Sequence, residues 1–202
     1  MLKDFSTPEG VDAWVRSLDD RWPERQAIRG HIARLIAQLP AEEPRLLELA
    51  PGSGPLAQAL VEQVPGLDYT GVDNSLPLLA RARARLAKYS QQVTLVVADL
   101  NEEGWVNQLD GPFDAVVSMQ SLHDLGSAEQ IERVYYLCRP LLAPGGVLLN
   151  ADFVVSPGEE DPDKPGRLTV DRHMELLAAY GYEDGRCTLQ EGQLACCQGS
   201  VP

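Results

Sequence analysis

The sequence predicts an α/β fold with a doubly wound, parallel sheet, and two observations carry this prediction. From Arg45 onward, short apolar segments that suit buried strands alternate with amphipathic helical segments. This order places helices on both faces of a parallel sheet. The first apolar segment, residues 46–49, also runs into the glycine-rich turn Gly52-Ser53-Gly54 and then into a helical segment. With 202 residues, 44% of them hydrophobic, the chain can bury a sizeable core.

Two helices are expected before the first strand. Thr7-Pro8-Glu9 supplies a capping residue, a first-turn proline and a first-turn acid for one helix. A second amphipathic helix is predicted from Pro23 to Pro40. Because both precede the alternating segments, we predict a helical cap over residues 1–40 and a main domain over residues 41–202. The cap either covers the ligand site or only packs on the sheet, and the sequence leaves both readings open.

Five strands and the helices between them are predicted from apolar patterning. The strands fall at residues 46–49, 69–72, 93–98, 113–118 and 147–153. The turn Pro144-Gly145-Gly146 is expected to precede the fifth strand, and Ser127 to open a helix through a capping box.

The last quarter of the chain is less regular. Residues 156–167 contain three prolines and a run of charges, which predicts either a mobile lid or an exposed crossover. A helix with Met174, Leu177 and Ala178 on its apolar face is expected to end at Gly181. Residues 185–199 predict two short strands.

Charge and cysteine content narrow the functional classes. The net charge of −13 disfavours stable binding to nucleic acid or to a membrane surface, because both are attracted to basic faces. The four cysteines form no C-x-x-C pair and, with the histidines, no zinc spacing, so we predict reduced thiols and no metal site. The first residues lack the apolar core of a signal peptide, so a cytoplasmic location is expected.

Polar residues cluster where the predicted strands end. Glu48, Asp73, Asp99 and Gln120 fall at or just after the carboxyl ends of four strands, the edge at which parallel sheets bind ligands. The segment Gly52–Ala57 also fits the G-x-G-x-x-A pattern of dinucleotide-binding loops, but that match is weak alone. A carboxylate at position 48 suits a cofactor that carries amino and sulfonium charges better than it suits a dinucleotide phosphate.

In this order, the motifs resemble those of the class I S-adenosylmethionine-dependent methyltransferases. The shared features are an acidic residue before a glycine loop, acids ending strands 2 and 3, and a Pro-Gly-Gly turn before strand 5. The resemblance runs from about Arg45 to the end of the chain and departs at Ala50, where the family usually has glycine. It implies a Rossmann-like, seven-stranded sheet with an antiparallel last strand, and S-adenosyl-L-methionine as cofactor, with S-adenosyl-L-homocysteine as product.

The resemblance also assigns expected roles to individual residues. Glu48 would anchor the loop or bind the amino group, Asp73 would bind the ribose hydroxyls, and Asp99 would accept from the adenine amino group. Each could instead be a plain cap or turn residue. His123 would deprotonate or orient the acceptor, or would only fix local structure. The full set of predicted cofactor-binding residues is Glu48, Ala50, Gly52, Gly54, Asp73, Asn74, Asp99, Leu100 and Gln120.

The predicted function is therefore methyl transfer to the O, N or carboxylate nucleophile of a small molecule, by a monomer or homodimer. The first alternative is a catalytically silent S-adenosylmethionine-binding protein that regulates or scaffolds a partner. The second is a nicotinamide-dependent oxidoreductase, which Glu48 and the Pro144-Gly145-Gly146 turn disfavour. RNA methylation is a weaker option because of the acidic charge.

Overall fold

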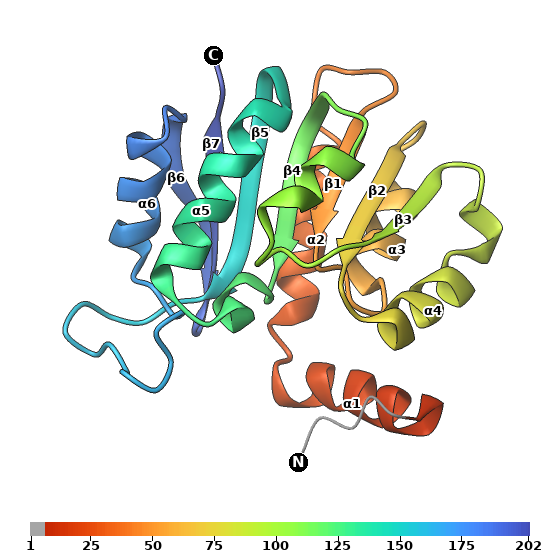
Figure 1. The fold of residues 1–202 in the computed structure, drawn as a ribbon, viewed down its shortest axis with the longest axis horizontal. Helices are drawn as coiled ribbons and strands as arrows, with labels where there is room; N and C mark the ends of the chain where they lie inside the picture. Colours follow the sequence, from red (N-terminus) through yellow and green to blue (C-terminus); the bar gives the residue numbers. More distant parts are fainter. Residues whose placement is uncertain (1–6) are drawn as a thin grey trace.

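A seven-stranded sheet organises residues 7–202, which the computed structural model describes. Its strands are β1 (Arg45–Leu49), β2 (Asp68–Asp73), β3 (Val93–Val97), β4 (Phe113–Met119), β5 (Leu142–Phe153), β6 (Glu183–Glu191) and β7 (Leu194–Ser200). They are ordered β3-β2-β1-β4-β5-β7-β6 across the sheet (Figure 1). Strands β1 to β5 pair in parallel, whereas β7 runs antiparallel to both β5 and β6. The predicted Rossmann-like sheet with an antiparallel last strand is confirmed.

Helices cover both faces of this sheet. They are α1 (Pro8–Arg21), α2 (Arg25–Ile36), α3 (Pro55–Gln63), α4 (Leu76–Arg85), α5 (Ala128–Cys138) and α6 (Val170–Ala179). Short 3-10 turns span Ala87–Tyr89, Glu103–Gln108, Leu122–Leu125 and Arg139–Leu141. In Figure 1, α5 lies in front of the sheet and α2 and α3 lie behind it.

The apolar strands are buried on both sides, which explains their nearly continuous hydrophobic sequence. Leu46 of β1 packs with α2 and α3 in one core cluster, and its neighbour Leu47 packs with α5 and α6 in the other. Successive side chains of a strand point to opposite faces, so one short segment serves both cores.

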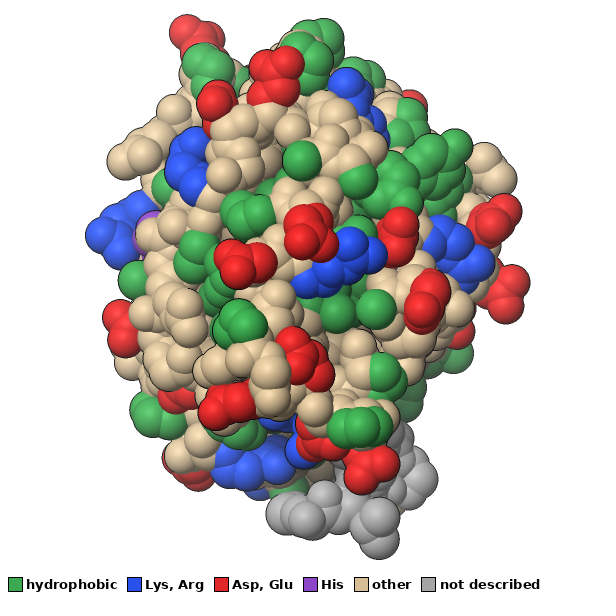
Figure 2. Space-filling model, turned by 90° about the vertical axis from the view of Figure 1, so that its left-hand side faces the viewer, with side chains coloured by type: hydrophobic (Ala, Val, Ile, Leu, Met, Phe, Trp, Pro, Cys, Tyr) green, Lys and Arg blue, Asp and Glu red, His purple; other side chains and the backbone are tan. Residues whose placement is uncertain are grey.

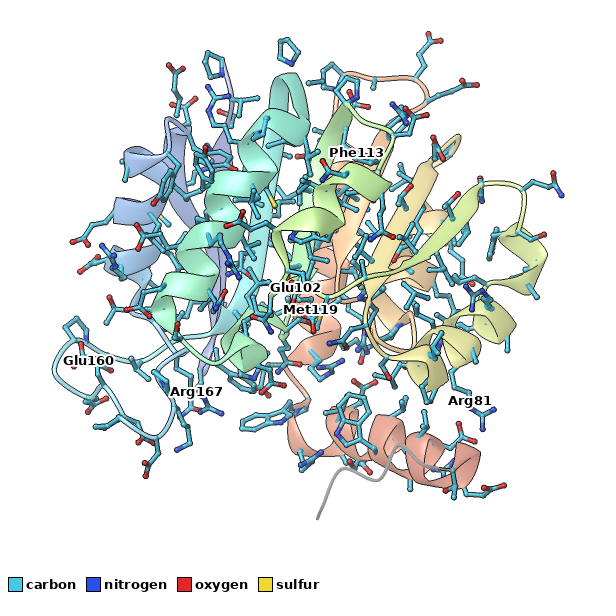
Figure 3. All side chains as sticks on the ribbon, in the orientation of Figure 1. Arg81, Glu102, Phe113, Met119, Glu160 and Arg167 are labelled. Atoms are coloured by element: carbon cyan, nitrogen blue, oxygen red, sulfur yellow. The ribbon has the colours of Figure 1, made fainter. Side chains whose placement is uncertain are left out.

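The two N-terminal helices take different positions. Helix α2 buries Ile28, Ile32 and Ile36 against the sheet, whereas α1 crosses the molecule at the carboxyl ends of the strands (Figure 1). Asp12 of α1 pairs with Arg81 of α4 at 2.8 Å, and Figure 3 shows Arg81 on α4. The first six residues of the predicted cap lie outside the described residues.

Helix α2 is shorter than the predicted span from Pro23 to Pro40. It begins at Arg25 and ends at Ile36, and tight turns follow in which Gln38 N donates to Leu35 O. Such i to i−3 bonds commonly tighten the end of a helix, and they use backbone groups that a longer helix would need.

The Pro144-Gly145-Gly146 turn is part of β5 and does not precede it. Gly145 N donates to Val201 O, and Val201 N donates to Gly146 O. Val201 therefore binds the turn to the sheet. The pairing of β4 with β5 also shifts register between Phe113 and Ala115. The prediction of a turn before the strand was wrong, because the sequence around the turn does not show that Val201 pairs with it.

The apolar face of α6 also differs from the prediction, since Ala178 is exposed. Instead, α6 buries His173, Leu176 and Leu177. The Tyr135 hydroxyl of α5 lies 2.9 Å from His173 Nδ1, and burial lowers the pKa of His173 to about 4. A neutral, hydrogen-bonded histidine can occupy a core position that apolar patterning does not assign to it. The two final strands are longer than the predicted 185–199 segment.

No helix within residues 7–202 has both the length and the apolar composition that crossing a membrane requires.

Candidate functional site

Two adjoining cavities lie where α1 crosses the carboxyl ends of the strands. We call one the Asp73 cavity; it has a volume of about 230 Å³ and is lined from the end of β2 and from the segments that follow β1, β3 and β4. The other, the His123 cavity, has a volume of about 300 Å³ and lies towards β4 and β5. Figure 3 labels Met119, which ends β4 and lines the His123 cavity. Both cavities share the lining residues Trp14, Ala50, Gly52, Gln120, Ser121 and Asp124.

The loop after β1 forms part of the wall between the cavities. Ala50 and Gly52 have left-handed backbones, with φ of 51° and 59°. A Cβ added at Gly52 would meet only Leu78, at 4.0 Å, so the backbone faces open space there. A ligand can therefore approach this peptide closely. Gly54 differs, because an added Cβ would lie 3.2 Å from Ala82 Cβ, and its small size serves the packing of α3 on α4.

Glu48 lies beneath this loop and lines neither cavity. Its side chain is buried, and the Tyr69 hydroxyl donates to Oε2 at 2.7 Å. Burial raises the pKa of Glu48 to about 8, the bond from Tyr69 opposes this rise, and the charge of Asp73 adds to it. Gly71 makes room for this pair, because its added Cβ would lie 2.8 Å from the Tyr69 hydroxyl and 3.0 Å from Pro51. Glu48 therefore binds Tyr69 of the neighbouring strand β2 and lies outside both cavities.

The buried Glu48 predicts that stability depends on pH. A carboxyl whose pKa is higher in the folded than in the unfolded protein binds more protons when folded, so the free energy of unfolding falls as pH rises from about 4.5 to about 8. Glu48→Gln keeps an acceptor for Tyr69 and cannot ionise. Relative to wild type, we expect this variant to gain stability between pH 5 and pH 8, by a few kcal/mol in urea unfolding.

Glu42→Gln, in the exposed turn before β1, is the matched control and should leave the pH dependence unchanged. Parallel stability curves for wild type and Glu48→Gln across this range would contradict the assignment.

Two of the three predicted acids, Asp73 and Asp99, line the Asp73 cavity together with their neighbours. Asp73 is 6% exposed, and its two carboxylate oxygens accept from Gly52 N at 2.9 Å and Ser75 N at 2.8 Å. Burial raises the pKa of Asp73, and these two bonds oppose the rise. Asp99 accepts from the Asn74 amide at 3.3 Å, and Leu100 also lines the cavity. The structure therefore brings together Asp73, Asn74, Asp99 and Leu100.

Gln120 occupies the boundary between the two cavities. Its backbone is left-handed, with φ of 52°, and its N–H donates to Ala151 O at 2.8 Å. Both polar atoms of its side-chain amide are buried without a hydrogen-bond partner among the described residues. Buried amides are rarely left unpaired, because desolvation without a partner is costly. A ligand with a donor and an acceptor would satisfy this amide.

His123 lines the second cavity and is held by Asp152 at the end of β5. Its Nδ1 lies 2.6 Å from Asp152 Oδ1, and its backbone N donates to Oδ2 at 2.9 Å. Burial and, to a smaller extent, the charge of Arg167 lower the pKa of His123, but the bond and charge of Asp152, with the charge of Asp124, outweigh these effects and raise the pKa above its usual value. In the neutral tautomer that donates from Nδ1, the lone pair is on Nε2.

Sequence reasoning missed Asp152, although a signal was available. Asp152 is a charged residue in the apolar run of the fifth predicted strand, near the edge that already carried the other site residues. For segment 156–167 the sequence predicts either a lid or a crossover. Its last residues reach the site: Arg167 lines the His123 cavity, and a Cβ at Gly166 would lie 2.2 Å from His123 O.

Comparison with known proteins supports one family. The profile of a family described as "Methyltransferase domain" matches residues 47–148, half of the chain. Demethylmenaquinone methyltransferase of Thermus thermophilus is 34% identical over 113 residues, which cover 56% of this chain and 49% of that protein. Carboxy-S-adenosyl-L-methionine synthase of Aeromonas hydrophila is 29% identical over 194 residues, covering 91% of this chain and 72% of that protein.

The fold comparison agrees with the sequence comparison. The structure described as "PigF with SAH" superposes with a TM-score of 0.74 at 15% identity, covering 97% of this chain and 60% of that one. This chain spans about half the length of the Thermus relative, 49% of it. From the matched profile, the sheet order and the motifs at its carboxyl edge, the chain belongs to the class I S-adenosylmethionine-dependent methyltransferases.

Proposed function

We propose that this protein transfers a methyl group from S-adenosylmethionine to a small-molecule acceptor, with the cofactor in the Asp73 cavity and the acceptor in the His123 cavity. The observation that carries the proposal is the junction of the two cavities at the unpartnered amide of Gln120. A cofactor and an acceptor bound on either side of this residue would lie end to end, as direct transfer between them requires.

The residues present fit this cofactor. The carboxylates of Asp73 and Asp99 can accept from hydroxyl and amino donors, and the open backbone at Gly52 allows close approach. The Gln120 amide offers both a donor and an acceptor. Glu48 and Gly54 would act by holding the loop in place. When bound, the cofactor supplies a methyl group already activated on a sulfonium.

The remaining work of the site is positioning and proton transfer. Trp14 lies over both cavities and would exclude water from the reacting groups. Neutral His123, oriented by Asp152, would accept the acceptor's proton at Nε2 as its O or N attacks. Good positioning alone contributes roughly 7–11 kcal/mol to lowering such a barrier.

A small acceptor is favoured over a nucleic acid. The His123 cavity, at about 300 Å³, is at the lower end of the range of small-ligand sites. The net charge is −13, and on the face shown in Figure 2 Lys and Arg side chains are scattered among Asp and Glu. Extended phosphate backbones need a continuous basic surface.

Two further parts of the proposal concern organisation and location. Residues 1–40 would act as a cap on the methyltransferase domain of residues 41–202, with α1 closing the cavities through Trp14. The four free cysteines are typical of a reducing compartment, which supports a cytoplasmic location.

Calorimetry with three ligands tests the cofactor assignment. We expect S-adenosylmethionine and S-adenosylhomocysteine to bind with micromolar dissociation constants and NAD to give no measurable heat, because the acidic pocket does not suit a pyrophosphate. Micromolar NAD binding without binding of either adenosyl ligand would overturn the proposal. Tight binding of both adenosyl ligands, with no transfer to any acceptor, would favour a silent cofactor-binding protein instead.

A further inference from the structure

Three arginines converge on the His123 cavity: Arg21 from α1, Arg25 from α2 and Arg167 from the segment after β5. Arg25 is neutralised by Asp19, with Nε 2.9 Å from Oδ1. Among residues 7–202, the Arg21 guanidinium bonds only to Ser17, and the guanidinium of Arg167 lies on the Phe153 ring. Neither Arg21 nor Arg167 forms an ion pair within 4 Å of a carboxylate in the described part of the chain. The bond from Lys164 and, to a smaller extent, the charge of Arg167 lower the pKa of Asp161.

The ring of Phe153 brings Arg167 close to the candidate base. Its centroid lies 4.5 Å from the Arg167 guanidinium, 4.9 Å from the His123 ring and 4.7 Å from the Trp22 ring. A cation, an imidazole and an indole therefore surround one phenyl ring at the edge of the cavity. Figure 3 shows Arg167 on the segment after β5, at the same end of the sheet as Met119.

Backbone packing fixes the position of Arg167. A Cβ at Gly166 would lie 2.2 Å from His123 O and 2.9 Å from His123 Cα, so the two backbones are in direct contact. Only glycine allows this approach. Arg167 follows immediately and is half-buried, so its side chain starts from a defined point beside His123.

The local charge is opposite to that of the whole chain. The protein carries −13, yet the charged side chains that line the His123 cavity are three arginines and the carboxylate of Asp124. Because Arg25 pairs with Asp19, the excess of positive charge comes from Arg21 and Arg167. A positively charged cleft attracts small anions, even in a protein whose net charge is negative. A guanidinium with free N–H groups binds a carboxylate or phosphate through two parallel hydrogen bonds.

We propose that the methyl acceptor carries an anionic group, a carboxylate or a phosphate, and that Arg167 binds this group with Arg21 adding to the positive charge. The apolar part of the acceptor packs against Trp22 and Phe153, next to His123. This inference rests on the proposed function, because it assigns the His123 cavity to the acceptor.

Matched acids and amides test the inference without turnover. Protein saturated with S-adenosylhomocysteine is titrated with benzoate, phenylacetate and phenyl phosphate, and with the neutral benzamide and phenylacetamide, by ligand-observed NMR. We expect the acids to bind at least about tenfold more tightly than the amides, since bonds to a charged partner are lost in the amides. The carboxylate and phosphate arms show which anion the site prefers.

Arg167→Gln should reduce the preference for acids over amides to about threefold or less. Arg167→Lys keeps the charge but loses the two parallel N–H donors of the guanidinium, so its preference should lie between those of wild type and Arg167→Gln. Arg186→Gln is the matched control, because it removes the same charge from an exposed position on β6. It should retain the full preference. S-adenosylhomocysteine is also titrated into every variant. Its affinity shows whether the variant is folded and has an intact cofactor site, independently of acid binding.

Equal binding of acids and amides, absence of binding by any acid, or an equal loss in Arg167→Gln and Arg186→Gln would overturn the inference while cofactor binding is intact. Failure of wild-type protein to bind S-adenosylhomocysteine would instead overturn the proposed function.

Discussion

Replacing His123 by alanine is expected to slow methyl transfer by about 10²–10⁴-fold, the usual contribution of a general base. The side chain lines the cavity proposed for the acceptor, and Asp152 holds its ring through Nδ1 at 2.6 Å. Cofactor affinity should stay nearly unchanged, because His123 does not line the Asp73 cavity. The measurements are the rate of S-adenosylhomocysteine release with an identified acceptor, and calorimetry of the cofactor.

The pH profile separates a base from a structural histidine. A base must be unprotonated, so kcat/KM should rise with pH through the pKa of His123 and then level off. Asp152 contributes to raising that pKa. Asp152→Asn removes the negative charge, so the inflection should move to lower pH while the plateau rate falls because the ring is less well oriented.

His31→Ala is the control for this experiment. His31 bonds to Thr188 and lines neither cavity, so its loss should leave both turnover and the pH profile as in wild type. Wild-type turnover in His123→Ala, or an inflection that stays in place in Asp152→Asn, would reduce His123 to a structural residue. Transfer would then depend on positioning alone.

Replacing Asp73 by alanine is expected to weaken cofactor binding by about 10- to 100-fold, the loss expected when a hydrogen bond to a charged acceptor is removed. Two effects act together. The ribose hydroxyls would lose their acceptor, and Gly52 N would lose its bond to Oδ2, so the loop that faces the cofactor would no longer be held. Calorimetry with S-adenosylhomocysteine measures this loss.

Asp68→Ala provides a matched control at the other end of the same strand. Asp68 begins β2 and pairs with Arg45 near the surface, away from both cavities. It should leave cofactor affinity unchanged. Asp73→Asn keeps one oxygen acceptor and should fall between alanine and wild type. Unchanged affinity in Asp73→Ala would show that neither a bond from Asp73 to the cofactor nor its hold on the loop contributes to cofactor binding.

The order of elements and the edge that carries the site were predictable because they follow from local patterns. Apolar segments separated by amphipathic helices predict the parallel sheet, and the carboxyl ends of its strands must then lie along one edge. Asp73, Asp99 and Gln120 could be placed together for this reason alone. In the structure these three residues line the Asp73 cavity, and the Gln120 amide, at the junction of the two cavities, has no hydrogen-bond partner among the described residues.

The environment of each group could not be predicted in the same way. The pKa of Glu48 is raised by complete burial and lowered in part by the bond from Tyr69, a residue 21 positions away for which Gly71 leaves space. His123 is oriented by Asp152, which is 29 positions away on another strand. Burial and hydrogen bonding depend on distances between segments, and patterning within a segment carries no information about them.

By itself, then, the sequence determined the sheet, the edge that carries the candidate site and the family, because periodicity and motif order are local properties of the chain. Only the tertiary structure decided which residues share the second cavity. The contact of Gly166 with His123 places Arg167 on the Phe153 ring, and α1 brings Trp14 over the strand ends. These residues lie on separate elements, and only the packing of those elements turns an acidic chain into one with an arginine-lined pocket.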